Sequence, residues 1–100
     1  MNAEQIAFQI ISNSGDAFGL LVEGLSYAKE KNFEETDRCI KEAKQALKVA
    51  HNVQTELLCS EANGKNIELS LLFIHAQDHL MNTILAETLI TEIIDMYREK

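Results

Sequence analysis

The sequence has no proline and only 4 glycines and 2 cysteines in its 100 residues. Proline is the strongest helix breaker and glycine supplies many tight turns, so their scarcity favours a few long helices. The two cysteines, Cys39 and Cys59, form neither a Cys-x-x-Cys pair nor a dense framework. We therefore expect reduced, buried thiols rather than a disulfide scaffold.

Basic residues are also few, since 9 Lys and Arg against 16 Asp and Glu give a formal net charge of −7. Such a chain repels phosphate backbones, which disfavours direct binding to nucleic acids or anionic membranes. No apolar run approaches the roughly 18 residues of a membrane span. The first five residues also lack the basic and apolar regions of a signal peptide. The sequence thus predicts a cytoplasmic protein.

The length fits a single domain, residues 1–100, and 46% hydrophobic residues are enough for a core. A domain of this size buries roughly 65% of its surface, so self-association would add useful stability. Apolar and small residues repeat at spacings of four and three, which predicts helices over residues 3–29, 33–62 and 67–98. The first stripe comprises Ile10, Ser14, Ala17, Leu21, Leu25 and Ala28, and the second Thr36, Ile40, Ala43, Leu47, Ala50, Gln54 and Leu57.

Two short breaks separate these segments. Asn32 can cap the second helix, with Glu35 three residues later as in a capping box. Gly64 follows a run of helix formers as a C-terminal cap, and Asn66 can cap the third helix. Short connections imply antiparallel neighbours, so we expect an all-α, up-down-up bundle of three helices. Gly15, inside the first segment, suggests close helix approach or a slight bend.

The third segment carries two faces. One suits the core of its own subunit and consists of Leu69, Phe73, Ala76, Leu80, Ile84, Ile90 and Ile94. The other, which we call the seam, consists of Leu71, His75, Asp78, Asn82, Leu85, Leu89, Glu92 and Met96. A three-helix subunit has no core left to receive the seam, and its spacing is typical of a coiled coil. The sequence thus predicts self-association through the third helix.

His75, Asp78 and His79 are spaced so that they share one helical face. Two His and a carboxylate could bind zinc, although Ala76 stands where a His-Glu-x-x-His motif has Glu. A His could also be a general base, but the sequence places no Ser or Cys nucleophile beside it. Alternatively, His75 could itself take and return a phosphoryl group. The residues alone leave these three chemistries open.

The segment from His75 to Leu85 resembles the signature of the lactose/cellobiose-specific enzyme IIA components of the bacterial phosphotransferase system. The resemblance covers essentially the whole chain. It extends to Ser14-Gly15-Asp16-Ala17, Ala50-His51, Gln54-Thr55 and Glu61-Ala62-Asn63-Gly64.

This resemblance implies a phosphocarrier that assembles as a homotrimer through the third helix. His75 would accept a phosphoryl group from the phosphocarrier protein HPr and pass it to a cysteine of the cognate IIB component. A beta-linked disaccharide of the lactose, cellobiose or diacetylchitobiose class would be phosphorylated later, at the membrane permease. Asp78 matches an acidic residue on the trimer axis that holds one structural divalent cation per trimer, taken to be Mg²⁺. His79 and Gln77 match residues that support the phosphorylation site.

The competing interpretation is a trimeric helical scaffold or regulatory module whose pair of histidines binds a metal. His51 flanks the stripe of the second helix, and we interpret it as structural.

Overall fold

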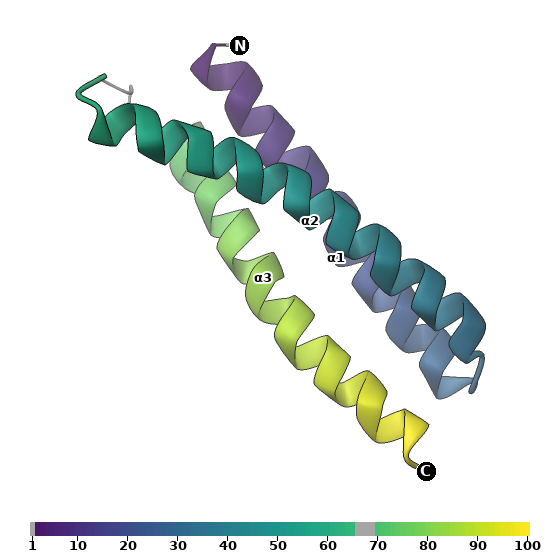
Figure 1. The fold of residues 1–100 in the computed structure, drawn as a ribbon. Helices are drawn as coiled ribbons and strands as arrows, with labels where there is room; N and C mark the ends of the chain where they lie inside the picture. Colours follow the sequence, from purple (N-terminus) through teal and green to yellow (C-terminus); the bar gives the residue numbers. More distant parts are fainter. Residues whose placement is uncertain (1, 66–69) are drawn as a thin grey trace.

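In the computed structural model, residues 2–65 and 70–100 are described, and they form three long α-helices (Figure 1). The helices are α1 (Ala3–Lys29), α2 (Phe33–Ala62) and α3 (Leu71–Arg98). The chain runs up, down and up, so that successive helices are antiparallel in a bundle of 52 × 19 × 19 Å. The described ranges contain no strand. The expected all-α bundle is therefore confirmed.

Side-chain amides cap the starts of α1 and α2. Asn2 accepts a hydrogen bond from the Gln5 backbone N–H (2.8 Å), and Gln5 accepts one from the Asn2 backbone N–H (3.0 Å), which completes a capping box. At α2, the Asn32 side chain accepts from the Glu35 backbone N–H at 3.4 Å, as predicted. The bounds of α1 and α2 are those that the periodic apolar stripes predicted.

The end of α2 is a Schellman turn. Gly64 has a φ of +87°, its N–H donates to the Glu61 carbonyl (3.0 Å), and the Lys65 N–H donates to the Ser60 carbonyl (3.1 Å). These two hydrogen bonds satisfy carbonyl groups that have no partner within the helix. Glycine adopts the positive φ without a steric penalty. The prediction that Gly64 ends the helix is confirmed.

The third helix begins later than the sequence suggested. Its N-cap is Ser70, whose hydroxyl accepts from the Phe73 backbone N–H at 3.1 Å, and the first helical residue is Leu71. The predicted start at residue 67 and the predicted cap Asn66 lie outside the described residues, and periodicity alone cannot choose between Ser and Asn as the cap. Leu69 of the core stripe also lies outside the described residues.

The core lies where the stripes predicted, with α1 packed along both other helices while α2 and α3 meet at few positions. The predicted stripe residues within the described ranges are all buried or half-buried. The fully or nearly fully buried apolar residues at its centre are Ala7, Ile10, Ala17, Leu21, Ala43, Ala50, Ala76 and Leu80. Small residues dominate this set, which lets the helices approach closely.

Gly24 lies at a close contact between α1 and α2. A Cβ built on Gly24 would lie 3.2 Å from Cβ of Cys39, whereas one on Gly15 meets nothing within 4 Å. The expectation of close helix approach at Gly15 was therefore wrong within this subunit. The buried Thr36 hydroxyl lies 3.0 Å from the Gly24 carbonyl oxygen and links the same two helices.

The two cysteines differ in environment. Cys39 is buried against α1, as expected, but Cys59 is exposed near the end of α2, and both are free thiols. The expectation of two buried thiols is thus confirmed for one of them only.

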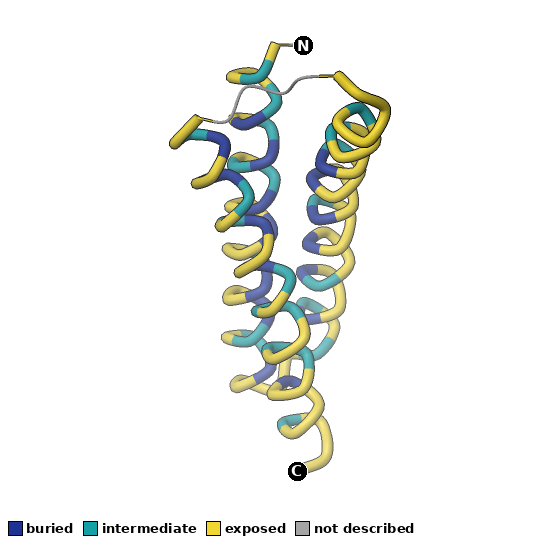
Figure 2. Tube along the Cα trace, turned by 90° about the vertical axis from the view of Figure 1, so that its left-hand side faces the viewer, coloured by how far each residue is buried: buried dark blue, intermediate teal, exposed yellow. Residues whose placement is uncertain are grey.

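The seam of α3 faces outwards along its length, as its amphipathic pattern predicted. Figure 2 shows the helices buried on their inner sides and exposed on their outer ones. All eight seam residues are exposed, including Leu71 (82%) and Met96 (63%). Among the described residues, no helix combines the length and hydropathy needed to cross a membrane.

Candidate functional site

The predicted site residues lie in the second and third turns of α3. His75 and Asp78 are exposed, and His79 is half-buried. Because a helix has 3.6 residues per turn, spacings of three and four place these three side chains on one side of α3. The capping of α3 at Ser70 fixes the start of the helix one turn before His75.

The two imidazoles pack against each other. Their ring centroids are 4.5 Å apart and their planes meet at 88°, an edge-to-face arrangement. Across the parts of the chain that the structure describes, no group of three or more His, Cys, Asp and Glu side chains could hold a metal ion.

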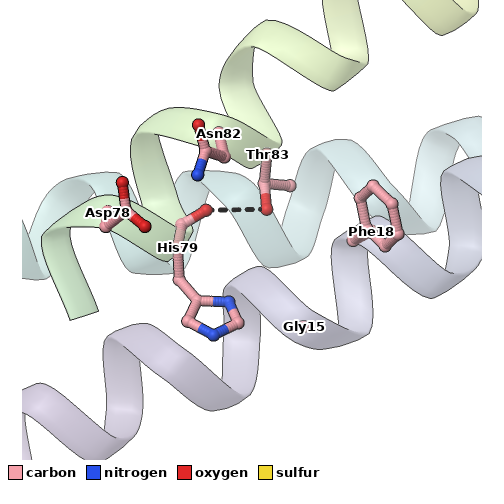
Figure 3. A pocket seen from close by; sticks show the side chains of 6 residues that line it. All are labelled: Gly15, Phe18, Asp78, His79, Asn82 and Thr83. Atoms are coloured by element: carbon pink, nitrogen blue, oxygen red, sulfur yellow. Dashed lines mark hydrogen bonds between the residues drawn. The ribbon is translucent and has the colours of Figure 1, made fainter. Parts of the chain in front are cut away.

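A shallow hollow lies between α1 and this part of α3 (Figure 3). The His79 ring points towards α1 there, whereas the Asp78 carboxylate points away from it. Because nothing lies within 4 Å of the position that a Cβ of Gly15 would take, the floor of the hollow is open. The hollow is lined by Gly15, Phe18, Asp78, His79, Asn82 and Thr83.

His75 lies outside that hollow, beside a second, largely apolar one formed with Leu71 and Leu72. Its neighbour Ile74 is also 51% exposed. An exposed imidazole among exposed apolar side chains is accessible to a partner, and a docked partner would remove water from around it.

Gln77 lies on another side of α3. Its Oε1 accepts a hydrogen bond of 2.7 Å from Nε2 of Gln54, which is buried on α2. Two residues along a helix correspond to about 200°, so Gln77 and His75 project in nearly opposite directions. Within one subunit Gln77 therefore does not meet His75, and its supporting role stays a prediction that requires a second subunit.

Thr83 also supports the site, and the sequence did not predict this role. Its buried hydroxyl lies 2.9 Å from the His79 carbonyl oxygen and 3.4 Å from the Ser14 carbonyl oxygen of α1. It thereby anchors the turn that follows His79 to α1. Its spacing of three from Leu80 and seven from Ala76 could have shown that it faces the core.

A comparison with known protein families shows which family the chain belongs to. The family described as "PTS system, Lactose/Cellobiose specific IIA subunit" matches residues 5–98. The chain belongs to this family. It is accordingly an IIA component of the lactose, cellobiose and chitobiose class of the phosphotransferase system.

Similar curated proteins span the whole IIA chain. The lactose-specific EIIA component of Staphylococcus epidermidis is 37% identical over 99% of this chain and 98% of its own. The lichenan-specific enzyme IIA component of Bacillus subtilis is 41% identical over 96% of this chain and 87% of its own.

Solved structures agree with the fold. The cellobiose-specific enzyme IIA of Bacillus anthracis superposes with a TM-score of 0.93 at 47% identity, covering 99% of this chain and 92% of that one. The IIA(chitobiose) chain of an Escherichia coli IIA–HPr complex gives a TM-score of 0.83 at 34% identity, covering 99% and 96%. The three-helix IIA fold of this chain is thus shared along its full length.

Proposed function

We propose that this IIA chain is a cytoplasmic phosphocarrier in which His75 accepts a phosphoryl group from phospho-HPr and passes it to a cysteine of a cognate IIB component. The observation that carries the proposal is the accessible His75 imidazole on α3 of a IIA-family chain. The similar IIA(chitobiose) was solved bound to HPr, which supports HPr as the donor. The transported sugar is a beta-linked disaccharide of the lactose, cellobiose or diacetylchitobiose class.

The chemistry needs one nucleophile and good alignment. An imidazole nitrogen without a proton attacks phosphorus with its lone pair, and the bond between phosphorus and the donor nitrogen breaks. Because the transition state of phosphoryl transfer is loose, catalysis consists mainly of holding donor, phosphorus and acceptor in line. A short helix segment with one exposed His suits this task, since the partner protein supplies the other half of the site.

His79 supports the phosphoryl group in this proposal. Its ring lies edge-to-face against that of His75, with the ring centroids 4.5 Å apart, so it is placed beside the acceptor. An imidazole N–H can donate to a phosphoryl oxygen. Docking of a partner over the exposed Ile74 would exclude water, which protects the phosphohistidine from hydrolysis.

Three copies of the chain would cover the apolar residues of the seam. Leu71, Leu85, Leu89 and Met96 are between 54% and 82% exposed in the subunit, an apolar stripe that is costly to leave in water. Burying the three stripes against one another gives a parallel bundle of α3 helices. We infer a homotrimer on this ground.

Asp78 would hold a divalent cation at the axis of that trimer. It lies in the middle of the exposed seam, so threefold symmetry would bring three carboxylates together. Three negative charges in a partly buried site repel each other unless a cation neutralises them, and carboxylate oxygens suit Mg²⁺. Such an ion would join the subunits and would supply charge neutralisation.

Intact mass spectrometry tests the phosphocarrier proposal. We expect wild-type protein incubated with phosphoenolpyruvate, enzyme I and HPr to gain one acid-labile phosphoryl group per chain. His75→Ala should gain none, because the acceptor nitrogen is gone. His51→Ala is the matched control, since it removes another exposed His and should leave phosphorylation unchanged.

Two results would contradict the proposal: no mass increment in wild type, or an increment that survives in His75→Ala. The scaffold interpretation instead expects an unphosphorylated trimer that binds zinc, with binding lost in both His75→Ala and His79→Ala.

A further inference from the structure

We propose that Asn63 is a site of spontaneous deamidation and that the Schellman turn at the end of α2 controls its rate. Asn63 is the C-cap of α2, and both it and Gly64 are exposed. Among the described residues, nothing lies within 4 Å of the position that a Cβ on Gly64 would take. The inference is independent of the phosphocarrier proposal.

The reaction needs only the chain and water. The backbone nitrogen of Gly64 attacks Cγ of Asn63, forming an N–Cγ bond. The bond from Cγ to the side-chain nitrogen breaks, and that nitrogen leaves as ammonia with the proton from Gly64. Water then opens the resulting succinimide at one of its two carbonyls, giving either aspartate or an isoaspartyl linkage. Glycine favours the attack because it has no side chain beside its nitrogen and rotates freely.

The native turn opposes the first step. The Gly64 N–H is engaged with the Glu61 carbonyl at 3.0 Å, and the next N–H, that of Lys65, is bound to Ser60. Asn63 also has a ψ of 13°, and its backbone must rotate before Cγ can reach the Gly64 nitrogen. Attack therefore proceeds from locally opened states, so its rate reports how often the end of α2 frays.

The helical asparagines provide an internal comparison. Asn13, Asn52 and Asn82 lie within helices and precede Ser, Val and Thr rather than Gly. The Asn13 amide also donates to the Gln9 carbonyl at 2.9 Å. Bulkier neighbours and continuous helical hydrogen bonding make each of these a poorer substrate than Asn63 for the same reaction.

The product changes the end of the helix. Aspartate at position 63 adds a negative charge at the helix C-terminus, where the macrodipole is already negative and the last turn has no basic residue. An isoaspartyl linkage adds the same negative charge and also lengthens the main chain within the turn between α2 and α3. Either product should weaken the end of α2.

The test follows deamidation of the full chain in mildly alkaline buffer by peptide mass spectrometry with isoaspartate detection. We expect Asn63 to convert before Asn13, Asn52 and Asn82. Conversion should be about tenfold or more slower in the native protein than in protein unfolded by urea, because opening must come first. Asn63→Gln should abolish the fast event, since its side chain would have to close a larger ring.

Two outcomes would overturn the proposal. If the helical asparagines convert as fast as Asn63 in native protein, residue 63 is not a preferred site. If the native and urea-unfolded proteins convert Asn63 at the same rate, the turn does not control the reaction.

Discussion

Cys39 shows how packing changes the chemistry of a single side chain. Its thiol is buried between α1 and α2, and this burial, reinforced by the Glu23 carboxylate, raises the thiol pKa above its ordinary value of 9.0. The Arg38 guanidinium opposes this rise in pKa. A folded chain therefore keeps the thiol proton to a higher pH than an unfolded chain does.

A pH-dependent stability follows from that difference in the pKa of Cys39. Because the folded-state pKa is raised, its contribution to stability is fully present below about pH 9 and is lost as the pH rises through the folded pKa. We expect the free energy of unfolding of wild type to fall more steeply above pH 9 than that of Cys39→Ala. Urea denaturation followed by circular dichroism at neutral and alkaline pH measures this slope.

The exposed Cys59 provides the control for that measurement. Cys59→Ala should keep the wild-type dependence of the free energy of unfolding on pH. Cys39→Ala should lose about 1–2 kcal/mol of that free energy at neutral pH, because the substitution leaves a cavity. It should also show the shallower fall above pH 9. Equal alkaline slopes for wild type and Cys39→Ala would contradict the account of this thiol.

The site could be predicted from the sequence only in part. Spacing alone placed His75, Asp78 and His79 on one side of a helix, because helical geometry is local. The bond between Gln54 and Gln77 could not be predicted, since it depends on how α2 and α3 are aligned along their lengths. The same limit applies to Thr83, whose partner Ser14 lies on another helix.

Among the elements, α1 and α2 pack closely at Gly24. Gly24→Ala would place a Cβ 3.2 Å from Cβ of Cys39, and neither atom can move without shifting a helix. We expect this variant to be destabilised by about 1–3 kcal/mol through overpacking, despite the better helix propensity of Ala. Thermal unfolding of the purified protein measures the change.

Gly19→Ala is the matched substitution in the same helix. Nothing lies within 4 Å of the Cβ that it would add, so we expect only the gain in helix propensity, about 0.5–1 kcal/mol of stabilisation. A Gly24→Ala variant as stable as Gly19→Ala would show that α1 and α2 are not closely packed there.

The helices themselves were largely predictable because their periodic patterns are long and uninterrupted by proline. The bounds of α1 and α2 followed from the stripes and the Asn32 cap. The start of α3 did not, since the Ser70 hydroxyl caps the helix in a stretch where several polar residues are good caps. Whether Gly24 or Gly15 lies at the close contact between α1 and α2 depends on tertiary packing, which composition does not encode.

At the scale of the whole molecule, the proposed trimer accounts both for the exposed seam and for the acidic residue Asp78 within it. In the proposed trimer, the apolar stripe would drive association, and Asp78 would introduce a charge repulsion that a cation can remove. We expect Asp78→Leu to remain trimeric, because Leu suits an apolar interface once the repulsion is gone, but to lose binding of Mg²⁺. Sedimentation and titration calorimetry measure the two properties.

Asp95→Leu is the control for the Asp78 experiment, since it removes an exposed α3 carboxylate outside the seam and should leave Mg²⁺ binding unchanged. Dissociation of Asp78→Leu into single chains, together with a wild-type trimer that survives a chelator, would argue against cation neutralisation.

In the proposed assembly, three chains associate around α3 and each presents one phosphoryl-accepting His75. Native mass spectrometry of the protein after incubation with phosphoenolpyruvate, enzyme I and HPr tests assembly and chemistry in a single spectrum. The account predicts a species of three chains that carries up to three phosphoryl groups. A spectrum of single chains, or of trimers that carry no phosphoryl group, would contradict it.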